Sequence, residues 1–192
     1  MKEILMSADF FCKNRMRLAN TLNKKSFAVV NSNDEMIRSA DQYFPYRQNS
    51  DFFFLTGINQ EKSVLLLFPD FPDKEMREVL FIRETSEKLE KWEGHKLTPE
   101  EASRISGIKT VKKLDELESV LAQFAFLAEN IYLNLYENPK IIPEFPSRDH
   151  RFAEHLKKNF PLHRYERLSP LIHNLRIVKA DEEIALIKEA CR

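Results

Sequence analysis

The chain of 192 residues has few glycines and cysteines and no long hydrophobic run. Its three glycines, Gly57, Gly94 and Gly107, lie far apart. A loop that cradles phosphates needs several glycines within a few residues, so the P-loop and the dinucleotide-binding fingerprint are excluded. No stretch approaches the roughly 18 apolar residues of a membrane-spanning helix, and no N-terminal run has the pattern of a secretion signal. We therefore expect a cytoplasmic protein with no membrane partner.

The two cysteines, Cys12 and Cys191, lie near opposite ends of the chain. Neither belongs to a Cys-x-x-Cys pair, and both fall on apolar positions of helical patterns. This favours reduced thiols over a disulfide, in agreement with a cytoplasmic location. Neither cysteine has an obvious activating neighbour, and the chain contains no Gly-x-Ser-x-Gly motif, so no nucleophilic enzyme is indicated.

Basic and acidic residues balance, with 30 of each and a formal net charge of zero. Because surfaces that bind nucleic acid are basic, we expect no nucleic-acid partner. Apolar residues make up 43% of the chain and charged residues 31%, which is ordinary for a water-soluble globular domain. The length suffices for one domain with a sizeable core, or for one domain and the start of another.

Short apolar runs alternate with amphipathic segments along the chain. Strands are predicted at residues 26–31, 52–55, 64–68, 79–82, 131–135 and 162–165. The run Phe52–Leu55 is so apolar that we expect a strand buried on both faces. Helices are predicted at 7–22, 98–107, 114–128, 147–159 and 168–175, with Ser7, Thr98 and Ser147 as N-caps and Gly107 as a C-cap. The alternation predicts an α/β fold with a mixed β-sheet flanked by helices.

The last residues have the pattern of a helix that continues. Asp181-Glu182-Glu183 places acids in a first turn, and Ile184, Ile187 and Cys191 begin an apolar stripe. Such a stripe needs a surface to pack on, and the sequence stops after about three turns. We expect one domain over residues 1–176, followed at 177–192 by a linker and the first helix of a second, missing domain.

The stretch from Arg38 to Gly57 is the least ordinary part of the chain. Its first half is crowded with polar groups and its second half is aromatic. Unpaired buried charges cost several kcal/mol, so we expect a convoluted loop held by arginine–carboxylate and amide hydrogen bonds. Loop architecture is the simpler role for these groups, because structural ion-pair networks are commoner than active sites.

No catalytic centre can be assembled from the remaining residues. The five histidines contain no His-Glu-x-x-His, and the spacing of five between His150 and His155 puts them on different faces of a helix. The pairs Glu100-Glu101 and Glu182-Glu183 are acids of first helical turns. Trp92, the only tryptophan, either packs a loop onto the domain or offers its ring to a ligand or partner. These residues predict a domain that assists a reaction carried out elsewhere.

Three stretches together resemble a known family. Arg38-Ser-Ala-Asp41, Tyr46-Arg-Gln-Asn-Ser-Asp-Phe52 and Leu55-Thr-Gly57 are similar to the signature of the N-terminal domain of Xaa-Pro aminopeptidases. These enzymes, also called aminopeptidase P, belong to the creatinase/prolidase "pita-bread" group. Glu90-Lys-Trp-Glu-Gly94 resembles the family's Glu-x-Trp-x-Gly segment, and Arg176–Ile184 resembles the junction into its catalytic domain. The resemblance runs from about Phe11 to the end.

This resemblance implies a ribonuclease-H-like topology and a parent enzyme that removes an N-terminal residue when proline follows. Two divalent metals, usually manganese, are held in this family by two Asp, one His and two Glu of the C-terminal catalytic domain. We therefore assign no metal ligand and no catalytic residue to this chain. The implied partners are the chain's own C-terminal catalytic domain, a peptide with proline at its second position, and a neighbouring subunit of a homo-oligomer.

The resemblance also implies roles for particular residues. Asp41 matches an aspartate at the rim of the active site, where a carboxylate can attract the α-ammonium group of the substrate. Trp92 matches a residue that extends toward the active site of a neighbouring subunit and bounds the substrate pocket. Residues expected to support the loop are Arg38, Tyr46, Arg47 and Asp51.

Two other functions stay open at this point. The pita-bread group includes a histone-chaperone subunit without peptidase activity, so a non-catalytic peptide- or protein-binding module is the alternative. A nuclease would fit the topology, but it requires clustered carboxylates on adjacent strands, and the predicted strands carry almost none. The neutral charge and the intact Tyr46–Phe52 string favour the aminopeptidase domain.

Overall fold

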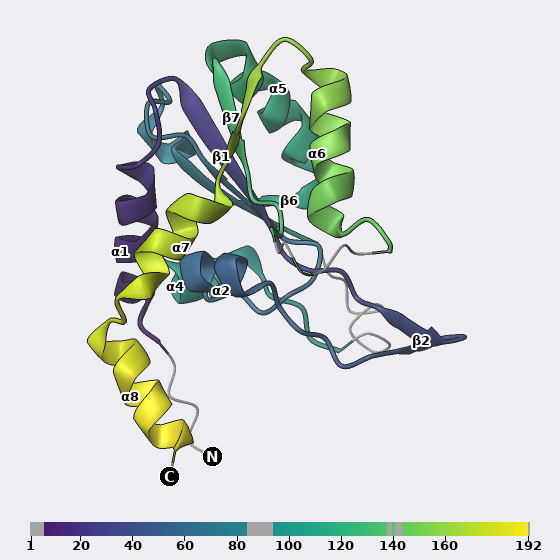
Figure 1. Ribbon diagram of the computed structural model, residues 1–192, viewed down its shortest axis with the longest axis vertical. Coiled ribbons are helices and arrows are strands. Elements are labelled where there is room, and N and C mark those ends of the chain that lie inside the picture. Colours follow the sequence, from purple (N-terminus) through teal and green to yellow (C-terminus); the bar gives the residue numbers. More distant parts are fainter. Residues whose placement is uncertain (1–5, 84–93, 138–139, 141–143, 192) are drawn as a thin grey trace.

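The centre of the protein is a six-stranded mixed β-sheet in the order β6-β5-β4-β1-β7-β8. The computed structural model describes residues 6–83, 94–137, 140 and 144–191 (Figure 1). The strands are β1 (Ser26–Asn31), β4 (Val64–Leu67), β5 (Glu78–Ile82), β6 (Thr110–Lys113), β7 (Asn130–Leu133) and β8 (Arg164–Arg167). β4 runs antiparallel to both β1 and β5, whereas the pairs β1–β7, β7–β8 and β5–β6 are parallel.

Helices cover both faces of this sheet (Figure 1). One face packs against α1 (Ala8–Ala19), α2 (Ser50–Thr56), α4 (Pro99–Ser106) and α7 (Ser169–Ile177), and the other against α5 (Leu117–Leu127) and α6 (Arg148–Asn159). Along β1, Ala28 and Val30 join the first core while Phe27 and Val29 join the second, because successive side chains of a strand point to opposite faces. The predicted α/β fold with a mixed sheet flanked by helices is confirmed.

Capping residues set the predicted helix boundaries. The side chains of Ser7, Thr98 and Ser147 accept hydrogen bonds from the backbone N–H groups three residues later, at the starts of α1, α4 and α6. Glu101 completes a capping box with Thr98, and Gly107 ends α4 with a φ of 73°. These helices form where the sequence predicts them because each start is fixed by a local hydrogen bond.

The predicted central strand at Phe52–Leu55 is wrong, since these residues form most of α2. The side chain of Asn49 accepts hydrogen bonds from the backbone N–H groups of Asp51 and Phe52 and so caps the helix. Gly57 ends it in the left-handed conformation, with a φ of 69°. A run of four apolar residues indicates burial but carries no period, so the two caps decide the structure.

Four short strands differ from the prediction. β6 was not expected at all, and β8 lies two residues beyond the predicted 162–165. Both are edge strands of polar composition. Polar side chains on an edge strand discourage pairing with other chains, and they also remove the apolar pattern by which a strand is recognised in the sequence. The predicted loop after Arg38 is in part a separate hairpin, formed by β2 (Ile37–Ser39) and β3 (Gln42–Tyr43).

The helix predicted near the C-terminus is present as α8 (Asp181–Ala190). It extends away from the layered part of the molecule (Figure 1). None of its residues is buried, and Ile184 and Ile187 remain 38% and 50% exposed. Its apolar stripe is thus largely uncovered by the described residues. That α8 begins a second domain stays a prediction.

Gly57 gives a first testable prediction. A Cβ at this position would lie 2.3 Å from Cε2 of Phe11. The substituted residue would also have to keep the positive backbone φ of 69°. The left-handed conformation costs about 1–2 kcal/mol and overpacking of the ring about 1–3 kcal/mol more. Gly57→Ala is therefore expected to lower the free energy of unfolding by about 2–5 kcal/mol in urea denaturation.

Gly94 provides the matched control for this prediction. Its φ is 77°, but a Cβ there would have no neighbour within 4 Å among the described residues. Gly94→Ala should therefore lower the free energy of unfolding only by the cost of the left-handed backbone, about 1–2 kcal/mol. If both variants lowered the free energy of unfolding equally, the added methyl group at position 57 would not be in tight contact with Phe11.

Candidate functional site

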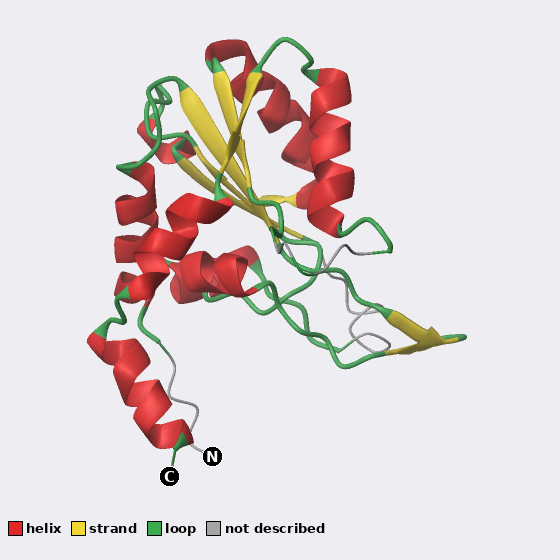
Figure 2. Cartoon of the chain, viewed as in Figure 1, coloured by secondary structure: helices red, strands yellow, loops and turns green. Residues whose placement is uncertain are grey.

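The hairpin β2–β3 projects from the layered part of the molecule (Figure 2). Its turn is formed by Ala40, which adopts a φ of 48°, and Asp41, so Asp41 lies at the tip and is exposed. Arg38 is also exposed, and within the described residues neither side chain forms an ion pair. Four apolar side chains on or beside the hairpin are more than half exposed: Met36, Ile37, Tyr43 and Phe44. A protruding apolar segment is typical of a surface that contacts another molecule.

Gln48 holds the base of this hairpin. Its side chain is 7% exposed, and its Oε1 accepts hydrogen bonds from the backbone N–H groups of Asn33 (3.1 Å) and Asn49 (2.8 Å). Its Nε2 donates to the carbonyl oxygens of Ile58 (3.0 Å) and Gln60 (3.1 Å). All four hydrogen bonds open to an amide side chain are made. One residue therefore ties together the segments before and after the hairpin and the loop that follows α2.

Asp51 connects this region with the C-terminal junction. Its Oδ1 accepts a hydrogen bond from Nη1 of Arg176, and its Oδ2 accepts one from Nδ2 of Asn134 at 3.1 Å. The guanidinium group of Arg176 also lies over the ring of Phe54, 5.6 Å from its centroid. Two motif stretches that are 125 residues apart in the sequence are thus joined by a partly buried ion pair.

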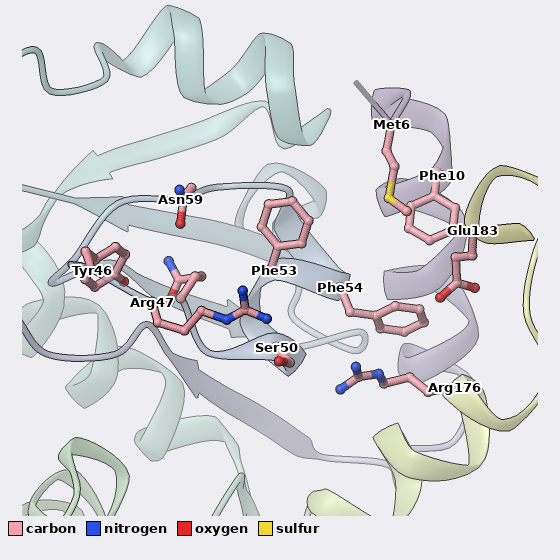
Figure 3. Close-up of a pocket in the computed structure, with 11 residues that line it drawn as sticks. Met6, Phe10, Tyr46, Arg47, Ser50, Phe53, Phe54, Asn59, Arg176 and Glu183 are labelled. Atoms are coloured by element: carbon pink, nitrogen blue, oxygen red, sulfur yellow. The ribbon is translucent and has the colours of Figure 1, made fainter. Parts of the chain in front are cut away.

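A cavity of about 400 Å³ lies where the start of α1, α2, α7 and α8 come together (Figure 3). Met6, Phe10, Phe53 and Phe54 form its apolar wall. The guanidinium groups of Arg47 and Arg176 extend toward Ser50 in Figure 3, and Glu183 approaches from α8. Aromatic walls with a few charged groups suit a ligand or protein segment that carries both apolar and acidic groups.

The predicted site residues are divided between the cavity and the hairpin. Tyr46 and Arg47 line the cavity, whereas Arg38 and Asp41 lie on the hairpin and Asp51 faces Arg176. Burial raises the pKa of Tyr46 to about 12, so its hydroxyl group stays protonated at neutral pH. The structure does not bring Asp41 into the cavity that Tyr46 and Arg47 line.

The sixth predicted site residue, Trp92, lies outside the described residues. Among residues 6–83, 94–137, 140 and 144–191, no group of three or more His, Cys, Asp or Glu is placed to hold a metal ion. This part of the chain therefore does not fit the two-metal centre that the resemblance implies for a catalytic domain. Cys12 and Cys191 are free thiols. A search of the same residues finds no helix that could span a membrane.

Comparison with known families decides to which of them the chain belongs. Residues 11–132, more than half of the sequence, match the family model described as "Aminopeptidase P, N-terminal domain". The chain belongs to this family. The resemblance of the motif stretches is thereby confirmed, and the hairpin, Gln48 and α2 are features of an aminopeptidase P N-terminal domain.

Several known proteins are similar to this chain over nearly its whole length. The Xaa-Pro aminopeptidase of Escherichia coli K12 is 29% identical over 192 residues, which cover 99% of this chain and 43% of that protein. A solved structure from Bacillus anthracis, titled as an aminopeptidase P, is 33% identical with a TM-score of 0.86, covering 96% of this chain and 43% of that one. Aminopeptidase P from E. coli in its low-pH form is 28% identical with a TM-score of 0.78, at 96% and 42% coverage. The chain thus spans about two fifths of the length of the relatives it matches.

Sequence reasoning did not assign roles to three residues that organise this aminopeptidase P domain. Asn49 could have been found, because Asn before Ser-Asp with a glycine eight residues later is the pattern of a short capped helix. Gln48 gives no such signal, since its four partners are all backbone groups. Arg176 stood out only as part of the junction, and its pairing with Asp51 depends on the tertiary fold.

Proposed function

We propose that this chain is the non-catalytic N-terminal domain of a Xaa-Pro aminopeptidase and that it shapes the substrate pocket of a catalytic domain encoded beyond residue 192. The observation that carries the proposal is the family match over residues 11–132 in a chain that corresponds to 43% of the E. coli enzyme. The absence of a metal-binding cluster from the described residues is consistent with chemistry in another domain. The domain would occupy residues 1–176, and the linker with α8 would occupy 177–192.

The proposed reaction is removal of the residue that precedes proline at the N-terminus of a peptide. Structures of the E. coli enzyme contain the inhibitor Pro-Leu in one case, and zinc with product in another. By analogy, two divalent metals, of which manganese is the usual one in this family, would belong to the catalytic domain and activate the attacking water there. The full-length protein would act in the cytoplasm as a homo-oligomer.

Asp41 is the residue of this chain that we propose contacts the substrate. It lies at the tip of a projecting hairpin, is exposed, and is not held by an ion pair within the described residues. A carboxylate so placed can extend beyond its own domain and bind a peptide α-ammonium group. Trp92 would bound the pocket of a neighbouring subunit. Gln48 and Asp51, with Arg176, would hold the hairpin and the junction in place.

Replacing the carboxylate of Asp41 tests this role. A hydrogen bond to a charged group contributes about 1.5–3 kcal/mol. Asp41→Asn in the full-length enzyme is therefore expected to lower kcat/KM for an Xaa-Pro dipeptide by about 10- to 100-fold, measured with manganese present. Asp115→Asn changes an equally exposed aspartate on the turn before α5 and should leave kcat/KM unchanged. An unaltered kcat/KM for Asp41→Asn would exclude the proposed contact.

The exposed hairpin also favours a second candidate, a non-catalytic module that binds peptides or proteins. More than half of each apolar side chain at Met36, Ile37, Tyr43 and Phe44 is open to solvent, which suits a binding surface without chemistry. The coding sequence beyond Arg192 separates the two candidates. The aminopeptidase requires two Asp, one His and two Glu as metal ligands there, and a downstream domain without them would favour the binding module.

A further inference from the structure

A second, small cavity lies at the carboxyl ends of the parallel strands β1 and β7. It has a volume of about 70 Å³ and is lined mainly by polar side chains, among them Asp51, Asn134, Asp149 and Ser169. Asn31 is the last residue of β1, and Asn134 directly follows β7. The carboxyl ends of parallel strands are where open α/β sheets bind ligands. The proposed aminopeptidase function makes no use of this cavity.

Two buried amide oxygens near this cavity accept no hydrogen bond from the described part of the chain. Asn134 lines the cavity and is 5% exposed; its Nδ2 donates to Asp51, whereas its Oδ1 accepts no hydrogen bond from a described residue. Asn31 is 3% exposed and donates in the same way to Oδ1 of Asp149, at 2.9 Å, and its own Oδ1 has no donor among the residues that the structure describes. Buried acceptor atoms in proteins almost always accept a hydrogen bond, so a donor or a cation is expected next to each of these oxygens.

One carboxylate at the cavity, that of Asp149, has no ion-pair partner in the described part of the chain. Asp51 pairs with Arg176 and Glu137 with Arg167, whereas no described residue forms an ion pair with Asp149. The neighbouring Arg148 instead donates to the Oγ of Ser32 at 2.7 Å. Burial raises the pKa of Asp149 to about 6, and the carboxylates of Asp51 and Asp34 add to this effect, while Asn31 and Arg148 oppose it. Above that pH, an ionised carboxylate is therefore held beside oxygen atoms that need a donor or a cation.

We propose that this cavity binds one alkali cation, Na⁺ or K⁺, through the carboxylate of Asp149 and the Oδ1 of Asn134, with water molecules as further ligands. Hard cations prefer oxygen ligands, and a single unpaired carboxylate matches a single positive charge. The volume admits one ion and a few waters. A divalent ion is disfavoured because no group of three His, Cys, Asp or Glu is placed to hold one in the described part of the chain. The bound ion would link α6 to the end of β7.

Thermal unfolding of the 192-residue chain in different chloride salts tests this site. The melting temperature is measured at pH 8 from about 5 to 200 mM NaCl or KCl, with N-methylglucamine chloride holding the ionic strength constant. A cation that binds only the folded state raises Tm with its concentration, and we expect a rise of about 3–6 °C. Asp149→Asn keeps the shape of the side chain but removes its charge, and its Tm should be independent of the alkali cation.

Glu154→Gln is the matched control, because Glu154 is an exposed carboxylate on the same helix α6. This variant should keep the full cation response. The Tm of Asp149→Asn at low salt reports whether it folds, and it should equal or exceed that of the parent because a buried ionised carboxylate is costly. The proposal would be overturned if the Tm of the parent chain did not change with the concentration of Na⁺ or K⁺. A response that persists in Asp149→Asn, or one that only Mg²⁺ produces, would also overturn it.

Discussion

Arg15→Met is expected to lower the free energy of unfolding by about 3–5 kcal/mol, the largest effect of any single substitution considered for this domain. The Arg15 side chain is fully buried, and its Nη1 donates to the carbonyl oxygens of Leu55 (2.8 Å) and Ser106 (2.9 Å). Its Nε pairs with Oε2 of Glu78 at 2.9 Å. Leu55 and Ser106 lie in the last turns of α2 and α4, whose carbonyl groups have no partner within the helix. One guanidinium group therefore satisfies the ends of two helices.

The methionine in this variant keeps most of the apolar stem, so the loss reports the missing hydrogen bonds rather than a cavity. Guanidinium chloride denaturation followed by circular dichroism measures it. Arg17→Met is the control, because Arg17 lies on the same helix but is exposed and makes one hydrogen bond, to the carbonyl oxygen of Leu175. It should cost less than about 1 kcal/mol. A similar cost for both substitutions would contradict the role of Arg15.

Gln48→Met is expected to cost about 2–4 kcal/mol, with its effect concentrated at the base of the hairpin. The substitution preserves the length of the side chain but leaves two backbone N–H groups and two carbonyl oxygens without their partner. Each buried polar group left unpaired costs about 1–3 kcal/mol, and water can relieve part of that cost near the surface. Hydrogen exchange should be faster at the amides of Asn33 and Asn49 than in the parent, while amides of β1 and β4 change only with global stability.

Gln123→Met supplies the control for this substitution, because Gln123 is an exposed glutamine of α5. We expect its free energy of unfolding to stay within about 0.5 kcal/mol of the parent. If Gln48→Met were equally mild, the hairpin would have to be held by other contacts, and the motif around Tyr46–Phe52 would need another explanation.

Elements with a local signal could be predicted from the sequence. Thr98-Pro99 with Glu101 and Gly107 defines α4 at both ends, because the capping groups lie within a few residues of the groups they satisfy. The apolar runs at β1, β4 and β5 were recognised because these strands are covered on both faces and carry almost no polar side chains. Phe52–Leu55 shows the limit of that signal, since a buried short helix and a buried strand share it.

Features that depend on tertiary contacts could not be predicted. Arg15 is an arginine in an amphipathic helix, and nothing near it in the sequence indicates that its partners are carbonyl groups of two other helices. The same holds for Asp51 and Arg176, which the fold brings together. The motif located the hairpin and Asp41 as the region of interest. The cavity beside α1, and the amide oxygens of Asn31 and Asn134 that have no donor among the described residues, emerge only from the three-dimensional arrangement.

We propose that this chain assists a metal centre located in another domain. To test this, the purified 192-residue chain is incubated with manganese and an Xaa-Pro dipeptide, and release of the N-terminal residue is measured. We expect no release above that of the buffer with manganese alone. Turnover that follows the concentration of the chain and disappears with EDTA would contradict it, because the described residues would then have to contribute to a complete catalytic site.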